Sequence, residues 1–412
     1  MNVLYVVGSC LTKNTSANMS HNAYVQGLLE NGCSVDIIMA ADSWGEADNA
    51  LPRFEQAHYH TYNATSFADR LRQFGRKKVF RASTEQISAF ASSTPISENS
   101  FRSHFSFRST AKVLFYKIFP NDPVYPLDRA WLKSASHFKS DKYYDLVISN
   151  SSPAASHKLV VLLKNAQHIN FGRWIQIWED PWYHDLYGGH SDAIREEEHS
   201  LLRAASEIFY VSPLTAEYQK KFYPDCAEKM NCIPLPFLEF TEDTPQEENV
   251  PLSFGYFGDY YSQTRNLRPF YDALCQSGHI GYIYGDSDLS LSSTEKITVS
   301  GRVTLDKLAI VQDHTSILVH LCNLRGGQIP GKIYHYSATS KPILFILDGT
   351  PKEQKIIFQF FDAFHRYCFC ENTPESILNG IQTLSQSNNL KYGSVDSFSP
   401  FSVVRKLLYS TM

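Results

Sequence analysis

Short apolar runs alternate with helix-like segments in two successive series, and this alternation is the feature that most restricts the fold. The runs of the first half are 3–7, 35–39, 144–149, 174–178 and 208–212, and those of the second half are 252–258, 280–285, 297–301, 316–320 and 342–346. Continuous apolar runs of this length are typical of parallel strands buried on both faces. The sequence therefore predicts an α/β protein with two doubly wound, Rossmann-like domains that face each other across a cleft.

The boundary between the two domains is predicted near residue 237. A chain of 412 residues exceeds the usual size of one core, so two domains are expected. The proline-containing passage 232–237 and the acidic stretch 239–248 lie between the two series of strands. We therefore predict a first domain over 1–236 and a second over 237–396, with a C-terminal helix within 397–412 that packs back on the first.

Charge and cysteine content exclude several classes of function. The net charge of −4 gives the whole molecule no general attraction for nucleic acid. The eight cysteines are scattered without paired C-x-x-C motifs, so no metal site and no cofactor are expected. The N-terminal apolar run is too short for a signal peptide, and no apolar stretch is long enough to cross a membrane. These features predict a cytoplasmic protein.

The segment 69–117 departs from this balance. It contains ten basic and three acidic residues, a net charge of +7, and phenylalanines are interleaved with the charges. Basic and aromatic residues together bind anionic lipid surfaces, so peripheral attachment to the inner face of the plasma membrane is one interpretation. A solvated basic insertion is the other, and the sequence favours neither.

Two loops of the second half carry candidate anion-binding residues. Ligands of doubly wound sheets bind beyond the carboxyl ends of the strands. Gly258 ends one strand and Arg265 follows it, and the glycine-rich segment 325–331 leads to Lys332. Arg265 and Lys332 at equivalent ends of one sheet would suit a diphosphate. The alternatives are an ordinary turn and a solvated lysine.

In the first half, two adjacent carboxylates follow the strand 174–178. Glu179 and Asp180 are framed by Trp178 and Trp182. Carboxylates can orient hydroxyl groups or accept a proton, and aromatic rings can hold sugars. In the alternative interpretation, Asp180 caps a turn and the tryptophans fill the core. Other polar side chains at these strand ends are Asn18, His21 and Ser151.

Several segments together resemble the family-4 glycosyltransferases of the GT-B fold, especially those that build bacterial capsule and O-antigen polysaccharides. Segment 330–336 with 341–344 is similar to the family's P-x-K-(L/I)-x-E-Y-L-A-x-G-K-P-(I/V)-L motif. Segment 179–182 resembles its D-P-W element, 144–153 the strand ahead of that element, 198–212 its E…A…V-S stretch, and 258–267 its G…R-x-L loop.

The resemblance implies a nucleotide diphosphate sugar bound by the second domain and a glycan or lipid-linked acceptor bound by the first. Sugar transfer would retain the anomeric configuration and require no metal. The implied catalytic residues are Glu179, Asp180, Arg265 and Lys332. The implied donor-binding residues are Gly258, Arg265, Gly285, Val303, Gly326, Gly327, Gln328, Lys332 and His335, and the implied acceptor-binding residues are Asn18, His21, Ser151, Trp178 and Trp182.

One departure from the family pattern leaves alternatives open. The two glutamates that the family carries fall at Gly327 and His335 in this chain. Gln328 or Asn323 could replace them in holding the donor. A nucleotide-sugar epimerase of the same architecture and a catalytically silent sugar-nucleotide-binding partner are the competing interpretations.

Overall fold

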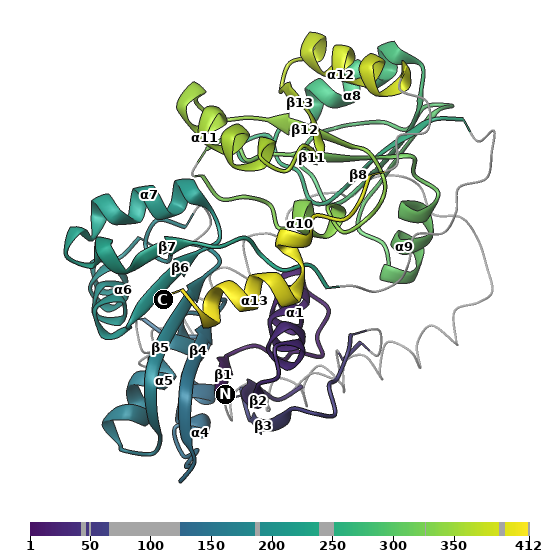
Figure 1. Ribbon diagram of the computed structural model, residues 1–412. Coiled ribbons are helices and arrows are strands. Elements are labelled where there is room, and N and C mark those ends of the chain that lie inside the picture. The colour runs from purple at the N-terminus through teal and green to yellow at the C-terminus, as the bar shows by residue number, and fades with distance from the viewer. Residues whose placement is uncertain are drawn as a thin grey trace, which may run out of the picture.

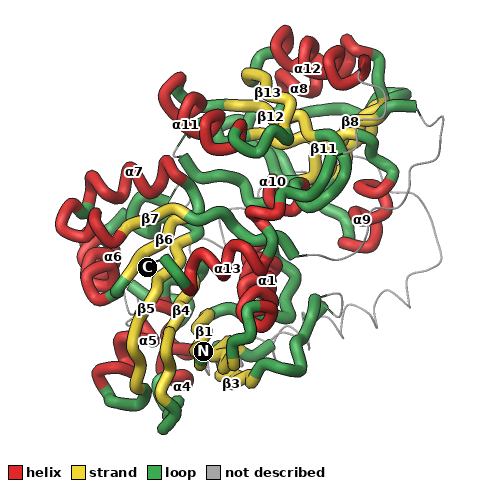
Figure 2. The backbone as a smooth tube through the Cα atoms, viewed as in Figure 1, coloured by secondary structure: helices red, strands yellow, loops and turns green. Residues whose placement is uncertain are grey.

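A computed structural model describes residues 1–42, 47–48, 51–65, 124–185, 190–238, 251–325, 327–386 and 392–410. The basic segment 69–117, the acidic stretch 239–248 and Gly326 lie outside these residues. The described chain forms two parallel sheets, each covered by helices (Figures 1 and 2). The predicted pair of doubly wound domains is confirmed.

The first sheet has seven parallel strands in the order β3-β2-β1-β4-β5-β6-β7. Their bounds are β1 Asn2–Val7, β2 Ser34–Ala40, β3 His58–Tyr62, β4 Tyr143–Asn150, β5 Asn170–Trp178, β6 Glu207–Tyr210 and β7 Met230–Cys232. Alternate residues of β1 enter two different cores: Tyr5 packs on one face of the sheet and Leu4 on the other. Burial on both faces is the reason for the continuous apolar runs.

The helices of this domain are α1 (Ser16–Glu30), α4 (Arg129–Ala135), α5 (Ala155–Asn165), α6 (Asp192–Ala204), α7 (Pro213–Phe222) and the 3₁₀ helix η1 (Pro224–Lys229). Polar residues fix where they begin. The side chains of Thr15, Ser191 and Ser212 accept hydrogen bonds from the first turns of α1, α6 and α7. Ser212 is the last residue of an apolar run, and serine is among the residues most favoured at this capping position.

The second sheet has six parallel strands in the order β10-β9-β8-β11-β12-β13. The strands are β8 Ser253–Phe257, β9 Ile280–Tyr284, β10 Ile297–Ser300, β11 Ile317–Leu321, β12 Ile343–Leu347 and β13 Tyr367–Glu371. The helices are α8 (Arg268–Ser277), α9 (Leu305–Asp313), α10 (Lys332–Tyr336), α11 (Pro351–Asp362) and α12 (Pro374–Gln386). In each sheet the strand order reverses once, between β1 and β4 and between β8 and β11.

One apolar core extends through both domains, and two passages of the chain connect them. One cluster of buried side chains includes Val211 and Leu214 of the first domain with Ile333 and Tyr334 of the second. After the 3₁₀ helix η2 (Asp396–Phe398), α13 (Pro400–Leu408) packs on α1 (Figure 1). The backbone N–H of Phe237 donates to the carbonyl of Phe398 at 3.1 Å, so the two passages lie side by side.

Among the described residues, no helix is both long enough and apolar enough to cross a bilayer.

Candidate functional site

Two groups of residues lie where the strand order of each sheet reverses. Beyond β1 and β4 lie Gly8 and Ser151, and beyond β8 and β11 lie Gly258 and Asn323. A reversal sends the flanking helices to opposite faces, which leaves backbone and side chains open to a ligand at the carboxyl edge. The side chains at these two edges are therefore the candidates for a functional site.

At the second edge, three cationic side chains gather around Asp259. The Nε of Arg265 donates to Asn323 Oδ1 at 3.0 Å, and its Nη1 donates to the Asp259 carbonyl at 3.1 Å. Arg302 forms a two-pronged ion pair with the Asp259 carboxylate, with its Nε at 2.9 Å from Oδ1. The arginine side chain holds the pKa of Asp259 below its usual range. Asp259 thus offsets one of the positive charges.

Lys332 is the third cation. The residue is half-buried, and its ammonium forms no hydrogen bond or ion pair with the described residues. Burial lowers its pKa to about 8, and the charges of Arg265 and Arg302 act in the same direction, although Asp259 opposes them. A desolvated ammonium next to two guanidinium groups is held at an energetic cost, which an anion bound among them would relieve.

The glycines that follow β8 and β9 lie where two backbone segments approach each other closely. Gly285 has φ of 155°, and a Cβ at this residue would lie 1.9 Å from the carbonyl oxygen of Gly258. The two loops therefore approach so closely that no side chain fits at Gly285. This contact explains why residue 285 is glycine. Gly258 lies close to Arg265 Nη1, because a Cβ at Gly258 would be 4.0 Å from that atom.

At the two positions where the resembling family has glutamate, this chain forms different contacts. Gly327 has φ of +72°, and its carbonyl accepts a hydrogen bond from Ser212 Oγ of the first domain at 2.5 Å. His335 lies one turn after Lys332 in the five-residue helix α10. Burial and the Lys332 charge lower its pKa to about 4, so it is neutral. Neither position supplies a carboxylate.

Gln328 forms a hydrogen bond between the two domains. Its side chain is buried, and its Nε2 donates to Asp185 Oδ1 of the first domain at 2.9 Å. Its backbone carbonyl accepts a hydrogen bond from Asn323 Nδ2 at 3.0 Å. Since Asn323 also accepts from Arg265, an unbroken chain of hydrogen bonds runs from the cationic group to Gln328 and the first domain.

Three carboxyl groups of the first domain follow β5. Asp180 has solvent-accessible surface, although protein atoms surround its carboxyl group. Burial and the charge of Asp185 raise its pKa to about 6, and hydrogen bonding by the Gln328 side chain acts in the opposite direction. Burial and the charge of Asp180 raise the pKa of Glu179 well above its usual range. Burial therefore favours the protonated form of both carboxyl groups.

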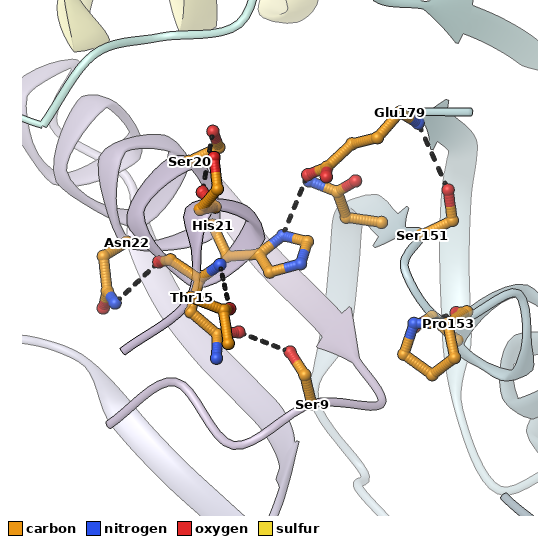
Figure 3. A network of polar contacts seen from close by, with 12 residues as sticks. Ser9, Thr15, Ser20, His21, Asn22, Ser151, Pro153 and Glu179 are labelled. Carbon is orange, nitrogen blue, oxygen red and sulfur yellow. Dashed lines mark hydrogen bonds and ion pairs between the residues drawn. The ribbon is translucent and has the colours of Figure 1, made fainter. Parts of the chain in front are cut away.

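Glu179 points toward His21 (Figure 3), with Oε1 3.7 Å from the His21 Nδ1. That nitrogen also lies 3.2 Å from the Tyr5 hydroxyl, to which Asn150 Nδ2 donates at 3.0 Å. Burial lowers the pKa of His21 to about 3, so its ring is neutral. Several buried polar atoms here have no hydrogen-bond partner within the described part of the chain: His21 Nε2, Tyr24 Oη, Asn150 Oδ1 and Glu179 Oε1.

The other residues expected on the acceptor side are held by internal contacts. Asn18 donates to the carbonyls of Cys10 and Lys13, and its Oδ1 accepts from Ser9. Ser151 Oγ accepts from the backbone N–H of Glu179 at 3.2 Å (Figure 3). Both side chains therefore shape the loops that carry the network rather than projecting from it.

The two tryptophans occupy different environments. Trp178 is fully buried, its ring packs on His157 with centroids 4.2 Å apart, and its Nε1 donates to Gln176. It has no face open to an acceptor in this conformation. Trp182 is half-buried, with its ring 5.2 Å from that of Tyr125. Val303, expected on the donor side, packs against the core shared by the two domains.

One group of possible metal ligands occurs among the described residues, away from this site. His199, Asp225 and Cys226 have ligand atoms within 4.8 Å of one another. Asp225 accepts hydrogen bonds from Arg203 at 2.7 Å and from His199 at 2.8 Å, and these lower its pKa to about 2. The arginine repels a cation, so the contacts fit an ion-pair cluster better than a metal site.

Sequence reasoning missed some of the site. Arg302 follows the end of β10, and Asp259 follows Gly258, so the rule that ligands gather at strand ends could have identified both. Asp185 and Tyr5 carried no such signal. Tyr5 lies within a strand, and Asp185 meets Gln328 only because the two domains come together.

No family model and no curated protein matches the chain. Solved structures do. The apo form of the lipopolysaccharide outer core galactosyltransferase WaaB is 12% identical with a TM-score of 0.50, and the match covers 100% of both chains. A glycosyltransferase from Rickettsia africae ESF-5 is 12% identical with a TM-score of 0.53, over 99% of this chain and 96% of that one.

A weaker likeness extends to a UDP-GlcNAc 2-epimerase from Methanocaldococcus jannaschii, at 9% identity and a TM-score of 0.47. At these identities the likeness concerns the backbone alone, because one fold carries many activities. With its two parallel sheets and the arrangement of its domains, the chain has the two-domain, Rossmann-like GT-B fold.

Proposed function

We propose that this protein is a glycosyltransferase that moves a sugar from a nucleotide diphosphate sugar to a glycan or lipid-linked oligosaccharide during surface polysaccharide synthesis. The second domain binds the donor and the first binds the acceptor. Transfer retains the anomeric configuration, and the protein works at the inner face of the plasma membrane. The membrane, pathway and stereochemistry parts rest on the family resemblance of the sequence.

The observation that carries the proposal is the cationic group at the carboxyl edge of the second sheet. Lys332 lacks a partner among the described residues, and Arg265 lies beside it, where it donates to Asn323 Oδ1 and to the Asp259 carbonyl. A diphosphate placed here would meet both cations. They would neutralise the charge that develops on the leaving diphosphate, which is a task that a metal performs in other enzymes.

The first domain supports the other half of the proposal. Glu179 and Asp180 lie beyond β5 on the same edge as His21, and Gln328 links Asp185 to the donor side. Two adjacent carboxyl groups whose pKa values are raised by burial are suited to acid–base chemistry. Such a pair can orient and deprotonate an acceptor hydroxyl.

The absence of carboxylates at Gly327 and His335 favours a second candidate, a silent protein that binds nucleotide sugars without transferring them. Its cationic group would be the same. Only turnover separates the two, so binding and transfer must be measured on the same preparation. An epimerase would convert the nucleotide sugar without any acceptor.

The test is a thermal-shift series with UDP, GDP, dTDP and CMP and their sugars. We expect one nucleoside diphosphate to raise Tm, and CMP, which has one phosphate, to have no effect. Arg265→Ala and Lys332→Ala should abolish the shift. Lys307→Ala, which removes an exposed lysine of the same domain, should leave it intact.

The effective diphosphate is then supplied as its sugar, with and without a polyprenyl-linked acceptor, and the products are separated by mass. Transfer to the acceptor supports the glycosyltransferase. Binding without product supports the silent protein, and an epimerised sugar without acceptor supports the epimerase. If no nucleotide shifts Tm, the proposed function is wrong.

A further inference from the structure

An acidic residue lies within the cationic group of the second domain. Asp259 follows Gly258 at the end of β8, and its backbone carbonyl accepts a hydrogen bond from Arg265 Nη1 at 3.1 Å. The carboxylate of Asp259 is therefore only the length of one residue away from a guanidinium that we assign to the diphosphate. A negative charge so close to an anion site opposes binding, and its presence there calls for an explanation.

Two neighbouring loops hold this carboxylate in place. Its Oδ1 accepts from the backbone N–H of Asp286, which follows β9, at 3.0 Å, and from Arg302 Nε, which follows β10, at 2.9 Å. Its Oδ2 accepts from Arg302 Nη2. The Asp286 carboxylate also faces Arg302, with Oδ2 3.5 Å from Nε and with Oδ1 accepting from the backbone N–H at 3.2 Å. Asp259 thus cannot turn away without breaking contacts to both loops.

The pairing offsets the charge of Arg302. This side chain is 69% exposed, and an unpaired arginine beside an anion site would add to the attraction for every anion. Instead, two parallel hydrogen bonds join it to Asp259, which is the strongest arrangement of an arginine with a carboxylate. The charge of Asp259 also reaches Lys332: burial lowers the pKa of the lysine, and Asp259 opposes that fall. The group therefore attracts anions less strongly than its three cations alone would.

We propose that Asp259 selects ligands by charge: its pairing with Arg302 limits the attraction that an anion meets at Arg265 and Lys332, so that the site takes nucleotide diphosphate sugars and does not favour nucleoside triphosphates. This inference rests on the proposed function. Each further phosphate adds negative charge to a ligand, and repulsion by a fixed carboxylate grows with that charge. A triphosphate with the same base as the donor is thereby denied the electrostatic advantage that an unpaired Arg302 would give it.

The experiment measures Kd by calorimetry for three series of nucleotides of increasing charge: UMP, UDP and UTP; GMP, GDP and GTP; and dTMP, dTDP and dTTP. At pH 7 the Lys332 ammonium is mostly protonated, because its pKa is about 8. Low ionic strength limits screening, and EDTA removes metal ions that would neutralise the phosphates.

The proteins are the wild type, Asp259→Asn, Arg302→Gln and the double variant. Asparagine keeps an oxygen for the Asp286 N–H and removes only the charge. The matched control is Glu375→Gln, which removes an exposed carboxylate from α12 of the same domain. The control should bind every nucleotide as the wild type does.

For the base that binds, the wild type should bind the triphosphate no more than about threefold more tightly than the diphosphate. Asp259→Asn should increase affinity by a factor that grows along the series and reaches at least about tenfold for the triphosphate. Arg302→Gln leaves the carboxylate unpaired and should weaken binding, most of all for the triphosphate. The double variant should return the ratio of triphosphate to diphosphate affinity to its wild-type value.

Equal gains for the three nucleotides in Asp259→Asn would indicate a change of loop structure rather than of charge, and would overturn this inference while leaving the proposed function in place. A wild-type protein that binds the triphosphate more than about tenfold more tightly than the diphosphate would do the same. If no diphosphate binds, the proposed function fails, and this inference fails with it.

Discussion

Glu198 on α6 accepts a hydrogen bond from the backbone N–H of Trp182 at 3.0 Å, and this contact anchors the loop that carries Asp180 and Asp185. The second carboxylate oxygen accepts from the N–H of Tyr183 at 3.0 Å and from the Tyr223 hydroxyl at 2.9 Å. A fully buried side chain on a rigid helix thus fixes the position of the acidic loop.

The first prediction is that Glu198→Ala lowers the free energy of unfolding by about 2 to 4 kcal/mol, because three donors lose their acceptor inside the protein. Urea denaturation measures the loss. Glu196→Ala, which removes an exposed carboxylate from the same helix, should change stability by less than about 0.5 kcal/mol. Equal effects of the two substitutions would contradict the anchoring role.

The second prediction concerns the pH dependence of nucleotide binding. The pKa of Lys332 is about 8 in the free protein, so the ammonium that meets an anion disappears as the pH rises through this value. Affinity for the nucleoside diphosphate should therefore fall about tenfold between pH 7 and pH 9. Lys332→Arg keeps its charge over this range and should remove most of the fall. A wild-type affinity that is constant to pH 9 would show that Lys332 does not contact the anion.

The third prediction follows from the contact between α1 and α13. A Cβ at Gly27 would lie 2.2 Å from the carbonyl oxygen of Pro400. Alanine favours helices over glycine by about 1 kcal/mol, yet Gly27→Ala should destabilise the protein by roughly 1 to 3 kcal/mol, because backbone must move.

The matched control is Gly380→Ala on α12, where the nearest atom to a new Cβ is the end of the Leu344 side chain, at 2.8 Å. A side chain can move aside, so this substitution should cost less. If Gly27→Ala is the more stable of the two variants in urea denaturation, the packing explanation is wrong.

The fourth prediction concerns acid stability. His157 is fully buried, its Nδ1 lies 2.7 Å from Ser149 Oγ, and burial lowers its pKa to about 3. Between pH 6.5 and 3 the unfolded chain binds a proton here that the folded chain does not, so stability falls as the pH falls.

His157→Phe removes this titration and loses the hydrogen bond by a constant amount at every pH. The stability of the variant relative to the wild type should therefore improve by about 2 kcal/mol between pH 7.5 and pH 5. Urea denaturation at the two pH values provides the comparison. A relative stability that does not change with pH would contradict a neutral buried imidazole.

Apolar runs predicted the sheets because both faces of each parallel strand are buried. β1, β4 and β12 begin or end within two residues of their predicted positions. β3 was missed, since its sequence His58–Tyr62 is half polar, and β7 has only three residues. Local periodicity carries no signal for strands of these two kinds.

The candidate site residues Glu179, Asp180 and Arg265 could be proposed from the sequence for the same reason, since they follow strand ends. The pairing of Gln328 with Asp185 could not, because it depends on how the domains meet. The helix expected to begin at Lys332 is only five residues long, so the positive charge at this edge comes from side chains more than from aligned peptide dipoles.

The hydrogen bond between Phe237 and Phe398 has a consequence for motion between the domains. Because the two segments lie side by side at this bond, we expect any relative motion of the domains to be a rotation about this point. Two bodies joined at neighbouring points swing about a single axis more readily than they twist or separate. If the protein transfers sugars as proposed, donor entry and product release would then use the same opening between the domains.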